Sequence, residues 1–193
     1  MKIATACLAF LFVLAGCGQA PLAASVPDEP ALITVFGAID APPDRAGFDP
    51  QTEPLFAQYG LGFDTAVGLR WSQLAALEQY AVDVDFPSGG PVRHFSGPLM
   101  RDVMALVQPS EDGILLTALD GYQRRLDLLT LSAHDVVLAI RLDGRPLSLG
   151  GFGPAMVVWP RSVDPVLFGM PDDDWVWGVF AIEVRGEMPV AAP

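Results

Sequence analysis

The chain has 193 residues, which is the size of one compact domain. Asp and Glu number 23 against 11 Lys and Arg, and the formal charge of −12 argues against binding to DNA or RNA, because phosphate recognition requires a basic surface. Hydrophobic residues make up 51% of the chain, too large a share for a disordered protein. With 19 Gly, 18 Pro and only 18% charged residues, the composition favours short strands and tight turns over a helical bundle.

Residues 1–16 have the features of a signal peptide. Lys2 gives a positive start, and residues 3–15 form an apolar run that is too short to cross a hydrocarbon core of about 30 Å as a helix. The run ends in Leu14-Ala15-Gly16-Cys17, which resembles the bacterial lipobox, where cysteine receives a diacylglycerol before cleavage on its N-terminal side. We therefore predict a lipoprotein that begins at Cys17 and is anchored in a membrane through that residue.

Ordinary secretion is the alternative, with Gly18-Gln19-Ala20 as the cleavage site. Both routes export the protein, and the lipid-anchored form is expected in the periplasm. Gly18 follows the lipobox cysteine where an aspartate could stand, and by analogy with Gram-negative lipoproteins this favours the outer membrane. Cys7 lies in the removed segment on both interpretations, so the mature domain has no disulfide.

The exported part divides into three segments. Residues 17–30 are small, contain proline and show no periodicity, as is typical of a flexible tether. Residues 31–186 are predicted to form one domain, and residues 187–193 a C-terminal tail. We find no internal repeat and no second domain.

The first half of the domain begins with a predicted strand over residues 32–39 and a loop rich in proline and aspartate over residues 40–54. Apolar residues at helical spacing predict a short amphipathic helix over residues 71–79. Residues 80–86 alternate between apolar and polar side chains, which predicts a half-buried strand.

In the second half, Gly97-Pro98 is predicted to open a helix that ends before Pro109. Asp120-Gly121, between predicted strands at 114–119 and 122–128, is a strong hairpin signal. The remaining predicted strands cover residues 136–142, turned by Asp143-Gly144, then 155–159 and 175–184.

The inventory of reactive side chains is mostly negative. The mature domain lacks a cysteine nucleophile, and His94 and His134 have no partners at metal-ligand spacing, so no metal site is predicted. The chain has no nucleophile elbow, Walker A run or dinucleotide-binding glycine motif, and the glycine-rich residues 150–154 continue into proline where a phosphate cradle needs a helix. The acidic run 172–174 lacks the spacing of a calcium loop, so we interpret it as a solvated loop.

Aromatic and arginine side chains near the predicted strand ends suggest a cleft for a small planar heterocycle, because flat rings stack and guanidinium groups donate paired hydrogen bonds. The aromatic residues are Phe86, Tyr122, Trp159 and Trp177, and the arginines are Arg93, Arg141, Arg145 and Arg161. The alternative is that each aromatic residue belongs only to the core. For the heterocycle we predict stacking on Tyr122 and Trp159, with Asp120 or Arg93 meeting its hydrogen-bonding edge.

Five segments in order resemble the oxidoreductase molybdopterin-binding domain, which has the sulfite-oxidase fold. They cover residues 95–104, 118–122, 137–147, 153–160 and 176–184. The resemblance extends over about residues 31–186 and implies an α+β fold of mostly mixed β-structure with a few short helices.

The resemblance also defines what this chain lacks. Catalytic members bind molybdenum through a cysteine upstream of the segment that begins at Phe95, and here residues 82–87 read Val-Asp-Val-Asp-Phe-Pro. A carboxylate such as Asp85 is a harder ligand than a thiolate. Gly150 stands where many small relatives carry an arginine. We therefore expect no molybdenum and no redox cofactor.

Small exported members without the cysteine are similar to periplasmic pterin-binding regulators, which signal to a membrane enzyme that makes or degrades cyclic di-GMP. This resemblance implies a non-catalytic protein that binds a pterin without molybdenum, with the periplasmic part of a membrane signalling protein as its partner. Two alternatives remain open at this point: a cofactor-free structural or interaction lipoprotein, and a molybdopterin-dependent oxidoreductase.

Overall fold

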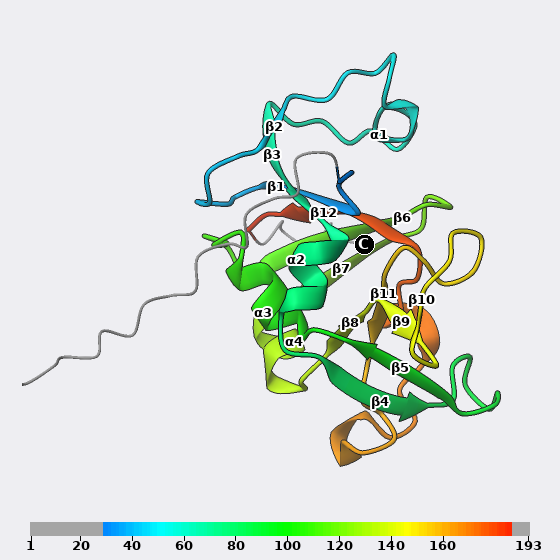
Figure 1. Ribbon diagram of the computed structural model, residues 1–193. Helices are drawn as coiled ribbons and strands as arrows, with labels where there is room; N and C mark the ends of the chain where they lie inside the picture. The colour runs from blue at the N-terminus through cyan, green and yellow to red at the C-terminus, as the bar shows by residue number, and fades with distance from the viewer. Residues whose placement is uncertain (1–28, 187–193) are drawn as a thin grey trace, which may run out of the picture.

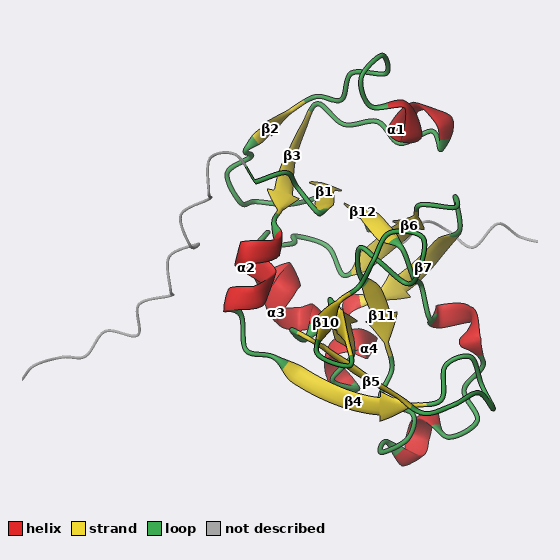
Figure 2. Cartoon of the chain, turned by 45° about the vertical axis from the view of Figure 1, so that its right-hand side comes forward, coloured by secondary structure: helices red, strands yellow, loops and turns green. Residues whose placement is uncertain are grey.

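The computed structural model describes residues 29–186, so the predicted signal peptide, Cys17 and the tail 187–193 lie outside the described residues. This part of the chain contains three sheets, four short α-helices and two 3₁₀ turns (Figures 1 and 2). The predicted α+β fold class is confirmed. Within residues 29–186, no helix is long and apolar enough to cross a membrane.

The largest sheet has six strands in the order β2-β3-β1-β12-β6-β7. Their bounds are β1 Ile33–Gly37, β2 Arg45–Ala46, β3 Thr65–Leu69, β6 Gly113–Ala118, β7 Gln123–Asp127 and β12 Val179–Val184. The central pair β1 and β12 is parallel, and the other pairs are antiparallel. The first and last strands of the domain therefore lie side by side at the centre of the sheet.

Two smaller sheets lie beside it. One has the order β10-β9-β5-β4, with β4 Tyr80–Val84, β5 Arg93–Gly97, β9 Arg141–Leu142 and β10 Arg145–Pro146. The other pairs β8 Val137–Ala139 with β11 Met156–Val158. Gly97 brings β5 against β8 so closely that a Cβ there would lie 2.1 Å from the carbonyl oxygen of Leu138. Only glycine allows this approach.

The helices are each one or two turns long: α1 Pro54–Gln58, α2 Trp71–Ala76, α3 Met100–Ala105 and α4 Leu128–Ala133. Figure 1 shows α2, α3 and α4 between the large sheet and the β4–β5 pair. Asp127 begins α4 by accepting a hydrogen bond from the backbone N–H of Thr130 (2.8 Å). Pro54 begins α1, where its missing N–H costs no helical hydrogen bond.

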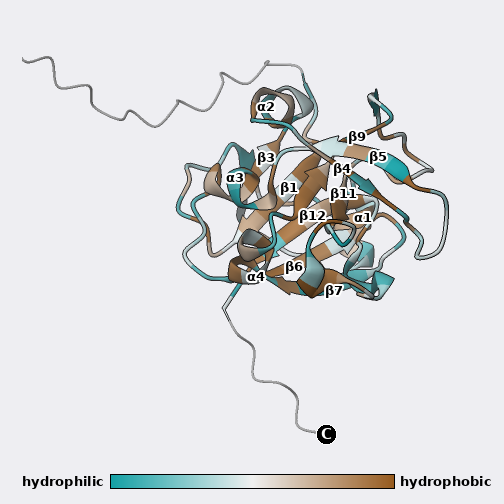
Figure 3. Ribbon diagram, turned by 90° about the horizontal axis from the view of Figure 1, so that it is seen from below, coloured by the Kyte–Doolittle hydropathy of each residue, from teal (hydrophilic) through white to brown (hydrophobic). Residues whose placement is uncertain are grey.

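The buried residues form two clusters. The main cluster fills the space between the sheets, and its fully buried side chains include Trp175, Phe95 and Leu138. Figure 3 shows the hydrophobic colouring concentrated on the central strands. The smaller cluster is built on Phe36, Phe56 and other aromatic rings on the opposite face of the large sheet, under α1.

Most predicted elements are present with shorter bounds. The structure confirms strands within 32–39, 80–86, 136–142 and 155–159, the helix near 71–79, and the hairpin across Asp120-Gly121. The last strand begins at Val179 and not at 175, because Gly178 (φ +70°) turns the chain just before it. The second helix begins at Met100 and not at Pro98, because Leu99 still has extended backbone.

The elements that were not predicted are α1, β2, β3, β5, β10, α4 and the two 3₁₀ turns. The strand predicted over 122–128 in fact ends at Asp127, where α4 takes over. The described structure begins two residues before the predicted domain boundary at residue 31. The Glu29 carboxylate accepts hydrogen bonds from Ser72, and its carbonyl accepts one from Arg70, so the last part of the predicted tether is fixed on α2.

Candidate functional site

A cavity of about 280 Å³ lies beside the end of β4 and the turn between β6 and β7. We call it the acidic aromatic pocket; it is lined by Phe86, Asp120, Tyr122, Asp172, Asp173, Trp175 and Trp177. Four of these residues are aromatic, three are aspartates, and none is basic. At about 280 Å³, the pocket lies just below the range of about 300–1,000 Å³ that is typical of ligand sites.

The hairpin turn holds Asp120 and Tyr122 in place. Asp120 Oδ1 accepts a hydrogen bond from the backbone N–H of Tyr122 (2.9 Å), and Gly121 follows in the left-handed conformation (φ +87°). The Tyr122 hydroxyl donates to the backbone carbonyl of Asp173 (2.8 Å). This contact joins the hairpin to the 3₁₀ turn η2 (Asp172–Asp174) across the pocket.

Stacked rings form one wall of the pocket. The rings of Phe86 and Trp175 are nearly parallel, 15° apart, with centroids separated by 5.2 Å. Trp175 is buried, and its indole N–H has no hydrogen-bond partner within residues 29–186. Tyr122 and Trp177 are 43% and 39% exposed, so their rings are accessible at the mouth of the pocket.

Behind this wall, the buried guanidinium of Arg161 joins two carboxylates. It donates to Asp172 Oδ1 (2.6 Å), to Asp85 Oδ1 (3.2 Å) and to the carbonyl of Met170 (3.0 Å). Its Cζ lies 4.5 Å from the centroid of the Trp175 ring, a cation–π distance. Arg161 therefore balances the charge of Asp172 and fixes the back of the indole.

Asp85 occupies the region where the resemblance places a molybdenum-ligating cysteine. Its Oδ2 accepts the backbone N–H of Gly89 (2.9 Å). This hydrogen bond, with a further contribution from Arg161, lowers the pKa of Asp85 below its usual value against the opposing effect of partial burial. The carboxylate is thus kept ionised as a counter-ion for Arg161.

These residues do not fit a molybdenum cofactor. The described residues contain no cysteine, so no thiolate faces the pocket. Both oxygens of the Asp85 carboxylate already accept hydrogen bonds, from Gly89 and Arg161, so this carboxylate is not free to bind a metal in place of a thiolate. No basic residue lines the pocket to bind a cofactor phosphate. Within residues 29–186, no three His, Cys, Asp or Glu side chains form a group that could hold a metal ion.

The structure brings together two of the four predicted binding residues, Asp120 and Tyr122. Trp159 is 3% exposed and does not line the pocket; its Nε1 donates to the carbonyl of Asp174 (2.9 Å), so it supports η2 from the core side. Arg93 does not line the pocket either. Its guanidinium donates to the carbonyl of Phe86 and lies 5.8 Å from the ring centroid of Phe152.

The sequence analysis missed the contribution of the segment 172–175. We interpreted residues 172–174 as a solvated loop; they form the 3₁₀ turn η2, in which Asp173 is exposed, Asp172 binds Arg161 and Asp174 binds Arg124. The local sequence does not predict these ion pairs; Asp174 and Arg124, for example, are 50 residues apart in the chain. The aromatic residues Phe86 and Trp177, which we had placed near a cleft, do line the pocket.

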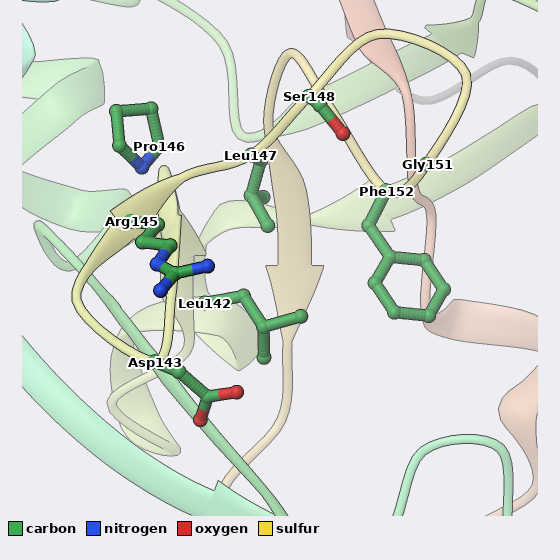
Figure 4. Close-up of a pocket in the computed structure, with 8 residues that line it drawn as sticks. All are labelled: Leu142, Asp143, Arg145, Pro146, Leu147, Ser148, Gly151 and Phe152. Carbon is green, nitrogen blue, oxygen red and sulfur yellow. The ribbon is translucent and has the colours of Figure 1, made fainter.

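A second cavity of about 550 Å³ lies between the β9–β10 hairpin and the loop that follows it (Figure 4). We call it the hairpin cavity; it is lined by Leu142, Asp143, Arg145, Pro146, Leu147, Ser148, Gly151 and Phe152. Phe152 packs edge-on against Phe86 with ring centroids 5.6 Å apart. Phe86 in turn lines the acidic aromatic pocket, so one aromatic layer separates the two cavities.

The fold defines the class of protein to which the chain belongs, an α+β domain with a mixed central sheet and short helices. No protein-family model and no curated protein sequence matches this chain. Among solved structures it is similar to the sulfane dehydrogenase SoxCD from Paracoccus pantotrophus, with a TM-score of 0.51 and 12% sequence identity. The match covers 80% of this chain and 38% of the SoxCD chain, so our chain spans less than half of that protein.

At 12% identity, this likeness bears on the fold alone. It supports the predicted resemblance to molybdopterin-binding domains as a distant likeness in structure. The two observations that concern ligands, the missing cysteine and the charge of the pocket, come from this chain.

Proposed function

We propose that this protein is an exported, lipid-anchored and non-catalytic binding protein whose acidic aromatic pocket holds a pterin or a related planar heterocycle. The observation that carries the proposal is the pocket lining, in which four aromatic rings and three carboxylates face a space of about 280 Å³ with no basic residue. Stacking faces and hydrogen-bond acceptors in one small cavity suit a flat ring with N–H donors on its edge.

The carboxylates indicate which edge of the ring would enter. Arg161 and the backbone N–H of Ser88 bind the two oxygens of Asp172, whereas Asp120 uses only Oδ1, within its own turn. Asp120 Oδ2 and the side chain of Asp173 remain available as acceptors within the described structure. The amino-pyrimidinone edge of a pterin presents neighbouring N–H donors, which a carboxylate accepts in pairs.

The same charges argue against a phosphorylated ligand. A phosphate in the pocket would face Asp120 and Asp173 without a compensating cation, which is unfavourable at short range. We therefore propose the ring without a phosphate or a metal. We also propose that the ligand-bound protein contacts the periplasmic part of a membrane signalling protein. The resemblance to exported pterin-binding regulators is the basis for proposing this partner.

The two alternatives make different predictions. A structural or interaction lipoprotein would bind no heterocycle, and its pocket aromatics would serve packing only. An oxidoreductase would require a metal ligand that Asp85 does not supply in its pairing with Arg161. The ion pair between Arg161 and Asp85 therefore favours the hypothesis of a binding protein over that of an oxidoreductase.

The test is a titration of the purified full-length protein, in detergent, with unsubstituted pterin, followed by calorimetry and by tryptophan fluorescence. We expect saturable binding with one site per chain and a change in emission, because Trp175 and Trp177 line the pocket. Asp120→Asn keeps the turn-forming side chain and removes one charge. We expect it to weaken binding about tenfold, equal to about 1.4 kcal/mol, near the lower end of the range for a charged hydrogen bond.

Asp64→Asn is the matched control, since Asp64 is exposed and lines neither cavity. It should bind pterin as the unaltered protein does. The same ring carrying a phosphate should bind more weakly than the unsubstituted ring. Absence of pterin binding, or equal binding by Asp120→Asn at unchanged melting temperature, would contradict the proposed site.

A further inference from the structure

The hairpin cavity contains two opposite charges that are not paired with each other. Asp143 and Arg145 come from the turn and the second strand of the same hairpin, and both line the cavity. In the part of the chain that the structure describes, neither the Asp143 carboxylate nor the Arg145 guanidinium has a hydrogen-bond or ion-pair partner. Figure 4 shows both groups on one side of the cavity, with Phe152 on the other.

Apolar side chains form the rest of the lining. Leu142 and Leu147 point into the space between the charged groups and the Phe152 ring (Figure 4). Phe152 is fixed from behind, because its ring packs against Phe86 and Phe95 with centroids 5.6 and 5.9 Å away. The cavity thus has an apolar floor with two unpaired charges at one rim.

The loop that closes the cavity is held by its own backbone. The N–H groups of Gly151 and Gly153 both donate to the carbonyl of Ser148, at 3.1 and 3.0 Å. A Cβ at Gly153 would lie 2.5 Å from the carbonyl oxygen of Leu147, so the chain turns back on itself too tightly for a side chain. A cavity with a backbone set in this way loses less entropy when a ligand binds.

We propose that the hairpin cavity binds a small dipolar molecule with an apolar body, of which a free apolar amino acid is the simplest example. Its carboxylate would pair with Arg145, its ammonium group with Asp143, and its side chain would contact Leu142, Leu147 and Phe152. Arginine binds carboxylates in a two-pronged geometry, and an exposed carboxylate is the natural partner of an ammonium group.

The charge pattern favours a dipolar ligand over a simple ion. A carboxylate without an ammonium group would leave Asp143 unpaired and would experience its repulsion. An amine without a carboxylate would meet the same problem at Arg145. A ligand that carries both charges can pair with both groups at once.

The experiment is calorimetry of the full-length protein with L-phenylalanine, compared with 3-phenylpropionate, which lacks the ammonium group, and phenethylamine, which lacks the carboxylate. We expect L-phenylalanine to bind at least tenfold more tightly than either analogue. Arg145→Gln and Asp143→Asn should each weaken L-phenylalanine binding at least tenfold. Asn tolerates the positive φ (+50°) that Asp143 adopts, so Asp143→Asn preserves the hairpin turn.

Two controls separate this site from the acidic aromatic pocket. Arg125→Gln removes another exposed arginine, outside both cavities, and should leave binding unchanged. Asp120→Asn should also leave L-phenylalanine binding unchanged while weakening pterin binding. No heat of binding at millimolar L-phenylalanine, binding of either analogue as tight as that of L-phenylalanine, or a loss in Asp120→Asn as large as that in Arg145→Gln would overturn the proposal.

Discussion

Replacing Arg161 with methionine tests whether this arginine organises the acidic aromatic pocket. Methionine keeps much of the apolar stem and can still contact the Trp175 ring, so the change removes mainly the charge and its hydrogen bonds. Arg161 is 6% exposed, whereas the side chains of its partners Asp85 and Asp172 are 38% and 31% exposed. Water can therefore reach the two carboxylates once the guanidinium is gone.

The expected loss follows from this burial pattern. Removing one partner of a buried ion pair costs about 3–5 kcal/mol, and partly exposed carboxylates place this case near the lower limit, about 3 kcal/mol. For a domain of this size, a loss of about 3 kcal/mol corresponds to a fall in Tm of roughly 6–12 °C. Arg124→Met is the matched control. Arg124 also binds an aspartate of η2, but its side chain is 41% exposed, and we expect a cost of about 1 kcal/mol or less.

The penalty should depend on pH. The folded-state pKa of Asp85 is lowered, so its stabilising contribution is present above the unfolded value of about 3.9 and is lost as the pH falls through the lower folded value. The Gly89 N–H supplies the largest part of this contribution, and Arg161 supplies a further part. The stability difference between the unaltered protein and Arg161→Met should therefore be largest near pH 7 and shrink below about pH 4.

Urea unfolding followed by tryptophan fluorescence, at pH 7 and at several values down to pH 3.5, gives the measurement. A difference below 1 kcal/mol at pH 7 would show that Arg161 is not the organising group. A difference that stays constant over this pH range would mean that lost packing, and not lost charge, is responsible.

Three further predictions test other parts of the argument. Cys17→Ser should move the protein from the membrane to the soluble fraction, and equal membrane association of the variant in a fractionation assay would exclude anchoring through this residue. Elemental analysis of the purified protein should find no stoichiometric molybdenum, and sulfite oxidation should be undetectable; near one molybdenum per chain with turnover would refute this. Gly97→Ala should cost several kcal/mol or prevent folding, because its Cβ would meet the backbone of Leu138 and Ala139, whereas Gly62→Ala, whose Cβ has only an ordinary contact with Phe48, should change Tm little.

The sequence predicted those elements that are determined by residues close together in the chain. Asp120-Gly121 predicts the hairpin because the turn demands residues that adopt its backbone angles, and the observed register pairs Thr117 with Gln123 around it. The signal for α4 was also local and was missed: Asp127 caps the helix through Thr130, but we extended the preceding strand over it.

Other features depend on contacts between distant segments. β5 carries few apolar residues, and the reason for Gly97 becomes visible only where the strand meets Leu138. The pocket shows the same limit. Tyr122 could be selected as an aromatic residue at a turn, but its contact with Asp173 joins segments 51 residues apart. Trp159 is also an aromatic residue next to a turn in the sequence, but it is buried in the folded protein.

Arg161 explains how the back of the acidic aromatic pocket keeps its shape. Asp85 and Asp172 would repel each other across the back of the pocket, and the guanidinium between them turns this repulsion into two ion pairs. The same group packs over the face of the Trp175 ring, and Trp175 stacks on Phe86, so the aromatic wall depends on a charge that does not itself line the pocket. Because Arg161 is committed to this internal role, it is not available to bind an anion. Under the proposed function, the negative charge that remains at Asp120 and Asp173 would favour ligands that donate hydrogen bonds.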